Sequence, residues 1–281
     1  MIQAEWTEEI KPKSSLLSVD LTELWRYRDL LMMFVRRDVV SVYKQTILGP
    51  IWFFVQPIFT TIVFVVVFGN IAAISTDGLP MPLFYMSGIV LWNYFAECFN
   101  KTATTFRDNA GIFGKVYFPR LVMPLSVVIS SMLKLLIQLG LLACFWLWYQ
   151  WKGPFFTTNV AIILLPVLIV LMALLGLGSG LIITSLTTKY RDLTFLIAFG
   201  VQLLMYATPV IYPISSVPEK YRVWVQYNPL TAIIEAFRYG LLGKGSFTPS
   251  DLLYSTIVII GILVLGIVVF NRVEKNFMDT V

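Results

Sequence analysis

The ionisable side chains that interrupt the apolar stretches of this chain are the first candidates for chemistry. Lys134 stands alone in the run from Leu121 to Gln150, and Glu97 directly follows the run from Leu79 to Ala96. A charge inside a bilayer is costly and commonly marks a transport path or an ion pair. Glu97 and Glu235 are both candidate partners of Lys134, and the sequence leaves the choice between them open.

The other residue types do not favour the catalysis found in soluble enzymes. The chain has no histidine, which is the commonest general base and metal ligand. It also lacks a P-loop, since the nearest string, Gly240 to Ser246, has neither the glycine spacing nor a Ser or Thr after the lysine. We therefore expect no catalytic residue, metal or cofactor in this chain. If ATP drives the protein, ATP and Mg²⁺ must bind to a separate subunit.

The elements that position these residues are expected to be membrane helices. Hydrophobic residues make up 58% of the 281 residues and charged residues 13%, whereas a soluble domain is roughly 45–50% apolar. A bilayer span needs about 20 apolar residues in a row. Six charge-poor runs meet this need, namely 47–76, 79–96, 121–150, 153–188, 193–218 and 252–271. We predict an all-α integral membrane protein with six transmembrane helices.

The distribution of lysine and arginine predicts how these spans are oriented. With six spans, fifteen of these residues fall in the tails and alternate loops. The opposite loops hold five, namely Lys152, Lys220, Arg222, Arg238 and Lys244. Because cytoplasmic loops carry the excess of positive charge, both termini are expected in the cytoplasm. The net charge of +5 is then mainly an orientation signal and implies no nucleic-acid partner. The polar first twenty residues predict no cleavable signal peptide.

An amphipathic helix is predicted to precede the spans. Residues 20–44 place apolar side chains on one arc, and Asp20 is a suitable N-cap. The helix could anchor the chain to the lipid surface or dock a cytoplasmic partner. Arg28 and Asp38 favour docking slightly, because both fall inside the apolar arc. We assign residues 1–46 to a cytoplasmic tail with this interface helix, and 47–281 to the transmembrane domain.

Two connections are too apolar to be plain loops. The cytoplasmic loop 101–120 could be solvated, but a short amphipathic docking or gating helix fits its apolar content better. The outer region 212–250 holds several prolines and a helical pattern too short to span. We predict short re-entrant helices there, which need cover from protein or a watery cavity.

Two helix faces combine aromatic rings with an amide. Such faces can simply pack between helices, or they can line a path for sugar chains, since rings stack on sugar faces and amides replace water at hydroxyls. With Lys134, they form the candidate substrate path. The residues are Trp52, Gln56 and Phe59 in the first run, and Phe195, Phe199, Gln202 and Tyr206 in the fifth.

Five strings, in order, resemble the membrane permeases of ABC-type exporters for O-antigen, capsule and wall teichoic acid polysaccharides. They are Arg37 to Trp52 with Gln56-Pro57, Lys115 to Arg120 with Pro124, Lys189 to Leu193, Thr208 to Pro213, and Asn228 to Leu230 followed by Glu235 and Phe237-Arg238. The resemblance covers nearly the whole chain from about Leu21. One such string is weak evidence, whereas five in the same order are specific.

This resemblance implies a homodimer in a bacterial plasma membrane, bound to two copies of an ATP-binding subunit. The implied activity is ATP-driven outward transport of polyprenyl-diphosphate-linked polysaccharide. Three groups of residues acquire expected roles. Coupling to the ATPase would involve Arg28, Asp38, Arg107, Asp108, Phe113, Lys115 and Phe118. The outer gate would include Pro213, Pro229 and Glu235, and the lipid diphosphate would pass near Arg26, Arg36 and Arg37.

Rival functions remain open at this stage. An ABC exporter of a small molecule such as a drug or haem would share the six-span plan, and the aromatic faces disfavour it only mildly. An ion-coupled secondary transporter predicts acidic residues at mid-membrane and an internal repeat, and neither is visible. A membrane glycosyltransferase would need carboxylates near a nucleotide-sugar site, for which Glu97 alone is poor evidence.

Overall fold

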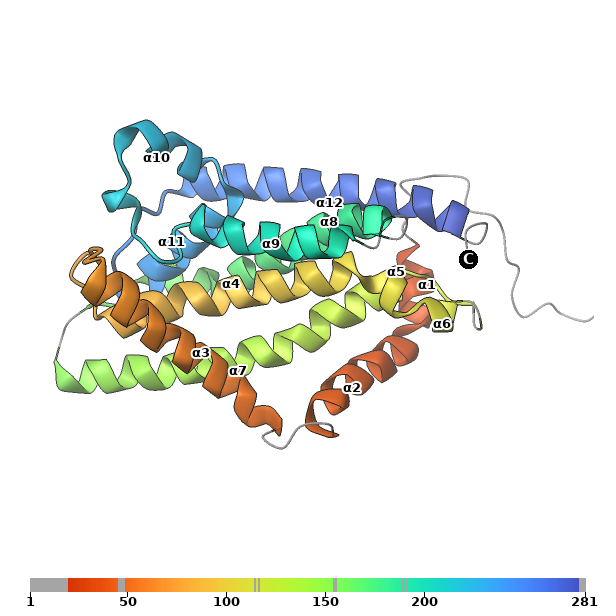
Figure 1. Cartoon of the computed structure of the whole chain (residues 1–281), viewed down its shortest axis with the longest axis horizontal. Helices are drawn as coiled ribbons and strands as arrows, with labels where there is room; N and C mark the ends of the chain where they lie inside the picture. The colour runs from red at the N-terminus through yellow and green to blue at the C-terminus, as the bar shows by residue number, and fades with distance from the viewer. Residues whose placement is uncertain are drawn as a thin grey trace, which may run out of the picture.

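A computed structural model describes residues 20–44, 49–113, 115, 117–153, 156–187, 190 and 192–277. Every regular element within these ranges is helical, which confirms the predicted all-α class (Figure 1). The expectations for the first nineteen residues lie outside the described part, as do those for Lys189 and Arg191.

The predicted interface helix is present as two pieces, α1 (Leu21–Arg26) and α2 (Arg28–Lys44). Asp20 caps α1 as expected, because its carboxylate accepts the amide protons of Thr22 at 3.0 Å and Glu23 at 2.9 Å. The chain turns at Tyr27 between the pieces. The apolar arc packs against α7 (Val122–Lys152) and the loop before it. Protein, rather than lipid alone, therefore covers this arc.

In the described part of the chain, four helical segments are long and apolar enough to cross a membrane. The first joins α3 (Trp52–Phe64) to the π-helix η2 (Val65–Ile71), and α7 is the second. The third joins η3 (Val160–Leu164) to α8 (Leu165–Thr187), and the fourth is α12 (Pro249–Phe277), apolar over Pro249–Val273. A membrane protein is thereby supported, with fewer clear spans than the six predicted.

The two remaining runs differ from simple spans for identifiable reasons. Helix α4 (Met81–Ala103) has 23 residues, but its last two turns carry Glu97 and Lys101, which lower its apolar character. It lies in the middle of the bundle and is largely buried. Helix α9 (Leu193–Tyr206) has only 14 residues and ends well before Pro218. Pro209 and Pro213 stop it, since proline removes a helical amide donor and restricts the residue before it.

The short helices predicted between residues 212 and 250 are present. They are the turn η4 (Ile214–Ser216), α10 (Glu219–Gln226) and α11 (Pro229–Leu242). Asn228 caps α11 by accepting the amide proton of Leu230 at 3.1 Å, and Gly243 ends it with a left-handed φ of 67°. Whether these helices re-enter the membrane stays a prediction.

Glycines bring the central helices into close contact. A Cβ added to Gly176 would lie 2.7 Å from Cβ of Cys98 on α4. A Cβ on Gly178 would lie 2.7 Å from Cα of Leu263 on α12, and one on Gly266 would meet the carbonyl oxygen of Gly178. Small residues allow membrane helices to approach closely. In this chain, Gly176 allows the close contact of α8 with α4, and Gly178 and Gly266 allow that of α8 with α12.

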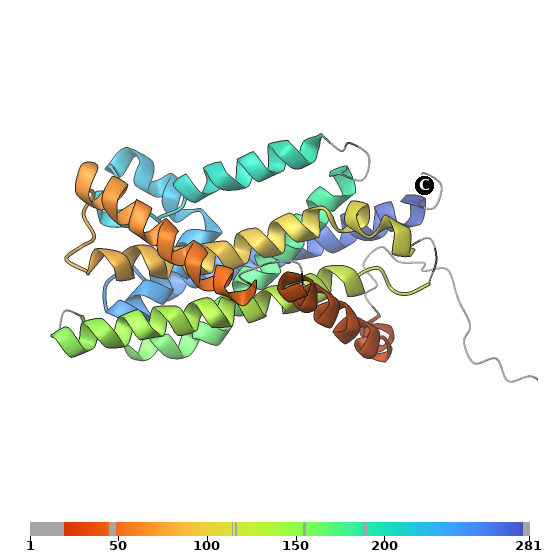
Figure 2. The same cartoon turned by 60° about the horizontal axis from the view of Figure 1, so that its bottom comes forward.

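Helices α3 and α9 lie on either side of α4 (Figures 1 and 2). Figure 2 shows α9 along the edge of the molecule and α3 crossing α4, and both helices contact α4. This position matters because both helices carry the predicted aromatic and amide faces.

Candidate functional site

The face predicted on the first span lies uncovered on α3. Trp52, Gln56 and Phe59 are all exposed, and together with Val55 and Thr60 they line one shallow pocket. Their spacing of four and three residues places them on one side of the helix, as the sequence predicted. A neighbouring copy, lipid or a transported molecule can therefore contact all three.

The second predicted face is equally open on α9. Phe195, Phe199, Gln202 and Tyr206 are exposed, and Phe195 reaches 82% exposure. Packing within one chain was the alternative explanation for such faces, and it does not account for rings left uncovered to this extent. The two faces remain available for contacts outside the chain.

Lys134 pairs with Glu97, which decides between its two candidate partners. Its Nζ atom lies 2.9 Å from Glu97 Oε2, while Nζ of Lys101 lies 2.8 Å from Glu97 Oε1. The three side chains belong to a pocket lined from four helices, which we call the lysine pocket. Polar and aromatic members of its lining are Asp38, Phe53, Glu97, Lys101, Ser130 and Lys134. The structure thus places Lys134 in this pocket and not with the aromatic faces.

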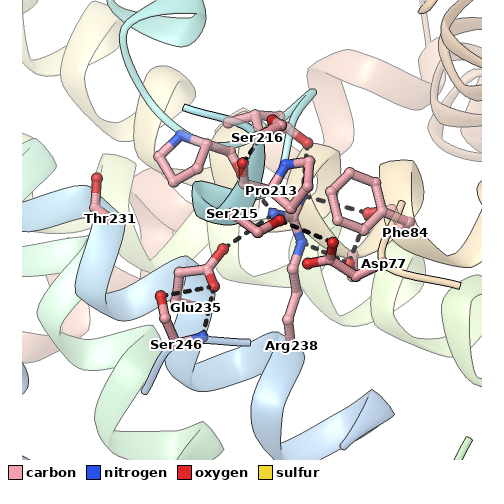
Figure 3. A network of polar contacts seen from close by, with 12 residues as sticks. Asp77, Phe84, Pro213, Ser215, Ser216, Thr231, Glu235, Arg238 and Ser246 are labelled. Carbon is pink, nitrogen blue, oxygen red and sulfur yellow. Dashed lines mark hydrogen bonds and ion pairs between the residues drawn. The ribbon is translucent and has the colours of Figure 1, made fainter. Parts of the chain in front are cut away.

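A second buried ion pair joins α11 to α4 and the turn after α9 (Figure 3). Arg238 is only 1% exposed, and its Nη1 lies 3.3 Å from Glu235 Oε1. It donates to the carbonyl oxygens of Pro209 at 2.5 Å and Val210 at 2.6 Å. Its guanidinium also lies 3.9 Å from the ring centre of Phe84. Burial of this charge is compensated by an acid, several carbonyls and a ring.

The rest of this network fixes the surrounding loops. Oε2 of Glu235 accepts the Ser246 amide proton at 2.9 Å, and Ser215 donates to Asp77 at 2.8 Å (Figure 3). Gly88 makes room for the guanidinium, since a Cβ there would lie 2.8 Å from Arg238 Nη2. We call these interactions the Arg238 network.

The residues expected at the outer gate lie in or near this network. Glu235 belongs to it, Pro213 is buried next to it, and Pro229 is the first residue of α11. Beside Pro213, the Tyr212 hydroxyl donates to the Tyr206 carbonyl at 3.1 Å.

At the opposite end, a row of aromatic rings connects the interface helix to the last helix. Phe34 on α2 lies 5.7 Å from Phe118, which stacks on Phe113 at 5.5 Å. Phe113 contacts Phe106 at 5.5 Å, and Phe106 stacks on Phe270 of α12 at 4.9 Å. We call these five rings the aromatic row. Phe113 and Phe118 are buried, so they would support a docking surface from beneath and not touch a partner directly.

The 101–120 loop contains α5 (Thr105–Asp108) and α6 (Ala110–Phe113), and it contacts α2 through a polar bridge. Arg37 binds Asp38 at 2.9 Å and reaches the Asn109 side chain at 3.4 Å. In the same loop, Arg107 pairs with Asp108 at 2.9 Å. The predicted single helix is thus two short ones.

The other charged residues named from the sequence lie on the surface. Arg28 pairs weakly with Asp29 at 3.9 Å and lies 5.5 Å from the ring centre of Trp25. Arg26, Arg36 and Lys115 are exposed as well. The interface helix and the adjoining loop therefore offer accessible charge at this end of the molecule.

A family comparison gives this arrangement its context. The family model described as ABC-2 type transporter matches residues 29–242. The chain belongs to this family. The expectation of a transport subunit rather than an enzyme, which rested on sequence strings, is thereby confirmed.

Several relatives of this ABC-2 transporter are polysaccharide export proteins by name. It is 27% identical over 255 residues to an O-antigen export system permease protein RfbA of Klebsiella pneumoniae, covering 89% of this chain and 94% of the relative. It is 21% identical to the polysialic acid transport protein KpsM of Escherichia coli, covering 87% and 93%. The capsule polysaccharide export inner-membrane protein CtrC of Neisseria meningitidis is 20% identical, covering 85% and 89%.

Two features of the ABC-2 transporter were missed or misjudged from its sequence. Arg238 was counted among the charges of the outer loops, but it is buried at the centre of a network. Its position four residues after Ile234 and three before Leu241 puts it on the apolar face of α11, which could have indicated this. The glycines at positions 176, 178 and 180 were not singled out, although spacings of two and four residues in an apolar helix are typical of close helix packing.

Proposed function

We propose that this ABC-2 transporter is the channel-forming subunit of an ATP-driven exporter of polyprenyl-diphosphate-linked polysaccharide. The observation that carries the proposal is the pair of exposed faces on α3 and α9, which join rings to amides. The names of the relatives supply the substrate class. A small-molecule exporter would not need such long faces of this composition.

In the proposed assembly, two copies of the chain enclose the path, each bound to one ATP-binding subunit. Residues 47–281 form a six-span domain in each copy, with α4 and α9 as the additional spans and both termini in the bacterial cytoplasm. Residues 1–46 lie at the cytoplasmic surface, and region 212–250 re-enters the membrane from outside. ATP and Mg²⁺ bind to the partner.

The proposed mechanism assigns each group of residues a step. The lipid diphosphate first meets the exposed arginines Arg26 and Arg36, with Arg37 held nearby by Asp38. Movement of the ATPase pair is passed to α2 and loop 101–120 through Arg28, Arg107, Asp108 and Lys115, which are accessible. The glycan then slides along the α3 and α9 faces. The helices around Glu235 open the exit.

The test compares two exposed helices in cells that lack the chromosomal copy. Phe195→Ala combined with Phe199→Ala should lower surface polysaccharide about tenfold, because each lost ring contact is worth about 0.5–1.5 kcal/mol. The matched control is Ile257→Ala together with Leu253→Ala on α12, which are also exposed. Surface polysaccharide is measured by immunoblot with expression checked in parallel. Normal export without the chain, or an equal loss in the control, would contradict the proposal.

A further inference from the structure

Counted together with Arg37, which binds Asp38, the lysine pocket holds three cations and two carboxylates. Glu97 is held between two ammonium groups, Lys101 at 2.8 Å and Lys134 at 2.9 Å. Asp38 also lines the pocket, but its carboxylate is bound by Arg37 at 2.9 Å. Each carboxylate therefore has a cation of its own, and one lysine remains in excess.

A purely structural ion pair does not explain this excess. Lys101 lies one helical turn from Glu97 on α4 and already neutralises it. Lys134 comes from α7 and adds a second cation to a partly buried site. An uncompensated charge is expensive inside a membrane protein, and apolar residues would hold α4 and α7 together at lower cost. An anion from outside the chain would remove this imbalance.

The position of the lysine pocket along the candidate spans indicates which anion could reach it. Phe53, the second residue of the α3 span, lies in its lining, as does Asp38 of the interface helix. The pocket therefore lies at the end of a candidate span, where lipid headgroups are found. The Lys101 side chain is 47% exposed, so the pocket is open to its surroundings. Ammonium groups at this depth bind lipid phosphates.

We propose that Lys101 and Lys134 bind the phosphate group of an anionic lipid at the mouth of the lysine pocket, since the enclosed space of about 30 Å³ has room only for water. Two sources share this chemistry, a membrane phospholipid and the diphosphate of a polyprenyl carrier. The second source rests on the proposed function, whereas the site itself does not. Glu97 lies between the two ammonium groups and competes with the phosphate for them.

The experiment measures lipid retention by the purified full-length chain in detergent, using native mass spectrometry. The probes are phosphatidylglycerol, undecaprenyl diphosphate and, as a neutral control, diacylglycerol. Lys134→Met should lower retention of at least one phosphate lipid by at least about fivefold, while Lys134→Arg should preserve it. Glu97→Gln should leave retention equal or higher, because it removes the competing carboxylate. Thermal unfolding confirms that each variant is folded.

The double variant Glu97→Gln with Lys134→Met separates binding from structure. If the pair were only structural, removing both charges would restore retention to the level of the unaltered chain, and the proposal would be overturned. Continued loss in the double variant supports it. Retention of phosphatidylglycerol identifies a phospholipid site, and preference for undecaprenyl diphosphate identifies the carrier. Equal retention of diacylglycerol would also overturn the proposal. None of these results depends on polysaccharide export in cells.

Discussion

Arg238 illustrates how much of this molecule depends on single side chains. Its guanidinium joins α11 to the carbonyls of Pro209 and Val210, which follow the end of α9. A cation near a helix C-terminus also interacts favourably with the negative end of the helix dipole. Because α9 carries an exposed aromatic face, Arg238 fixes one end of the proposed path without touching it.

Replacing Arg238 by Met should destabilise the chain strongly. The substitution leaves the Glu235 carboxylate buried without its cation and two carbonyls without a donor, and breaking such a pair costs about 3–5 kcal/mol. We expect a large fall in the thermal unfolding temperature in detergent. Lys220→Met on exposed α10 is the control and should unfold like the unaltered chain. A normal unfolding temperature for Arg238→Met would mean that the network contributes little.

The sequence identified the important charged residues, but it did not show which partners they have or which of them are buried. Lys134 was recognised because it interrupts an apolar run, yet its partner depended on which helices are neighbours. Arg238 was misjudged because a charge count treats every residue between two spans as loop. Burial of a charge depends on tertiary contacts that the local pattern does not contain.

The helices themselves are held together by close backbone contacts. At Gly266 of α12, an added Cβ would meet the carbonyl oxygen of Gly178 on α8. Gly266→Ala should therefore push the two helices apart and destabilise the chain by about 1–3 kcal/mol. Gly261→Ala on the same helix is the matched control, because a Cβ added there would have no heavy atom within 4 Å. Thermal unfolding distinguishes the two, and equal effects would contradict the packing argument.

Elements with strong local signals were the most predictable. Asp20 was predicted as an N-cap and does start the interface helix, whereas the cap at Asn228 was not predicted, although its side chain bonds the first turn of α11 in the same way. The fifth run was harder, because composition alone does not place a helix end. Pro209 and Pro213 end α9 after Tyr206, although the apolar residues continue to Val217. Hydrophobicity identified the run, and backbone restriction determined how much of it is helix.

At the scale of the whole molecule, the open face of α9 makes a prediction about assembly. Phe199→Cys in a Cys144→Ala background should give a crosslinked dimer with a short bismaleimide in membranes, because the proposed path lies between two copies. The remaining Cys98 is buried. Ile257→Cys on α12 is a control of similar exposure and should stay monomeric. The readout is gel mobility, and crosslinking only at Ile257 would place the interface on the other side.

The general plan of the molecule was accessible from its sequence, whereas its assembly was not. Apolar runs indicated membrane helices, and the ordered strings indicated the family. No pattern in one chain specifies which uncovered face meets a second copy, since lipid and protein both favour apolar side chains.

The aromatic row has a mechanical consequence for the proposed exporter. Phe34 of α2 and Phe270 of α12 are the two ends of this row, so the rings connect the interface helix to the last helix. A load applied to the interface helix would be transmitted to α12 and, through its glycine contact, onward to α8 in the interior. The movement would thus reach the bundle through α12 and α8. Helix α9 contacts α4 and α8 only over short stretches, so we expect it to move most easily.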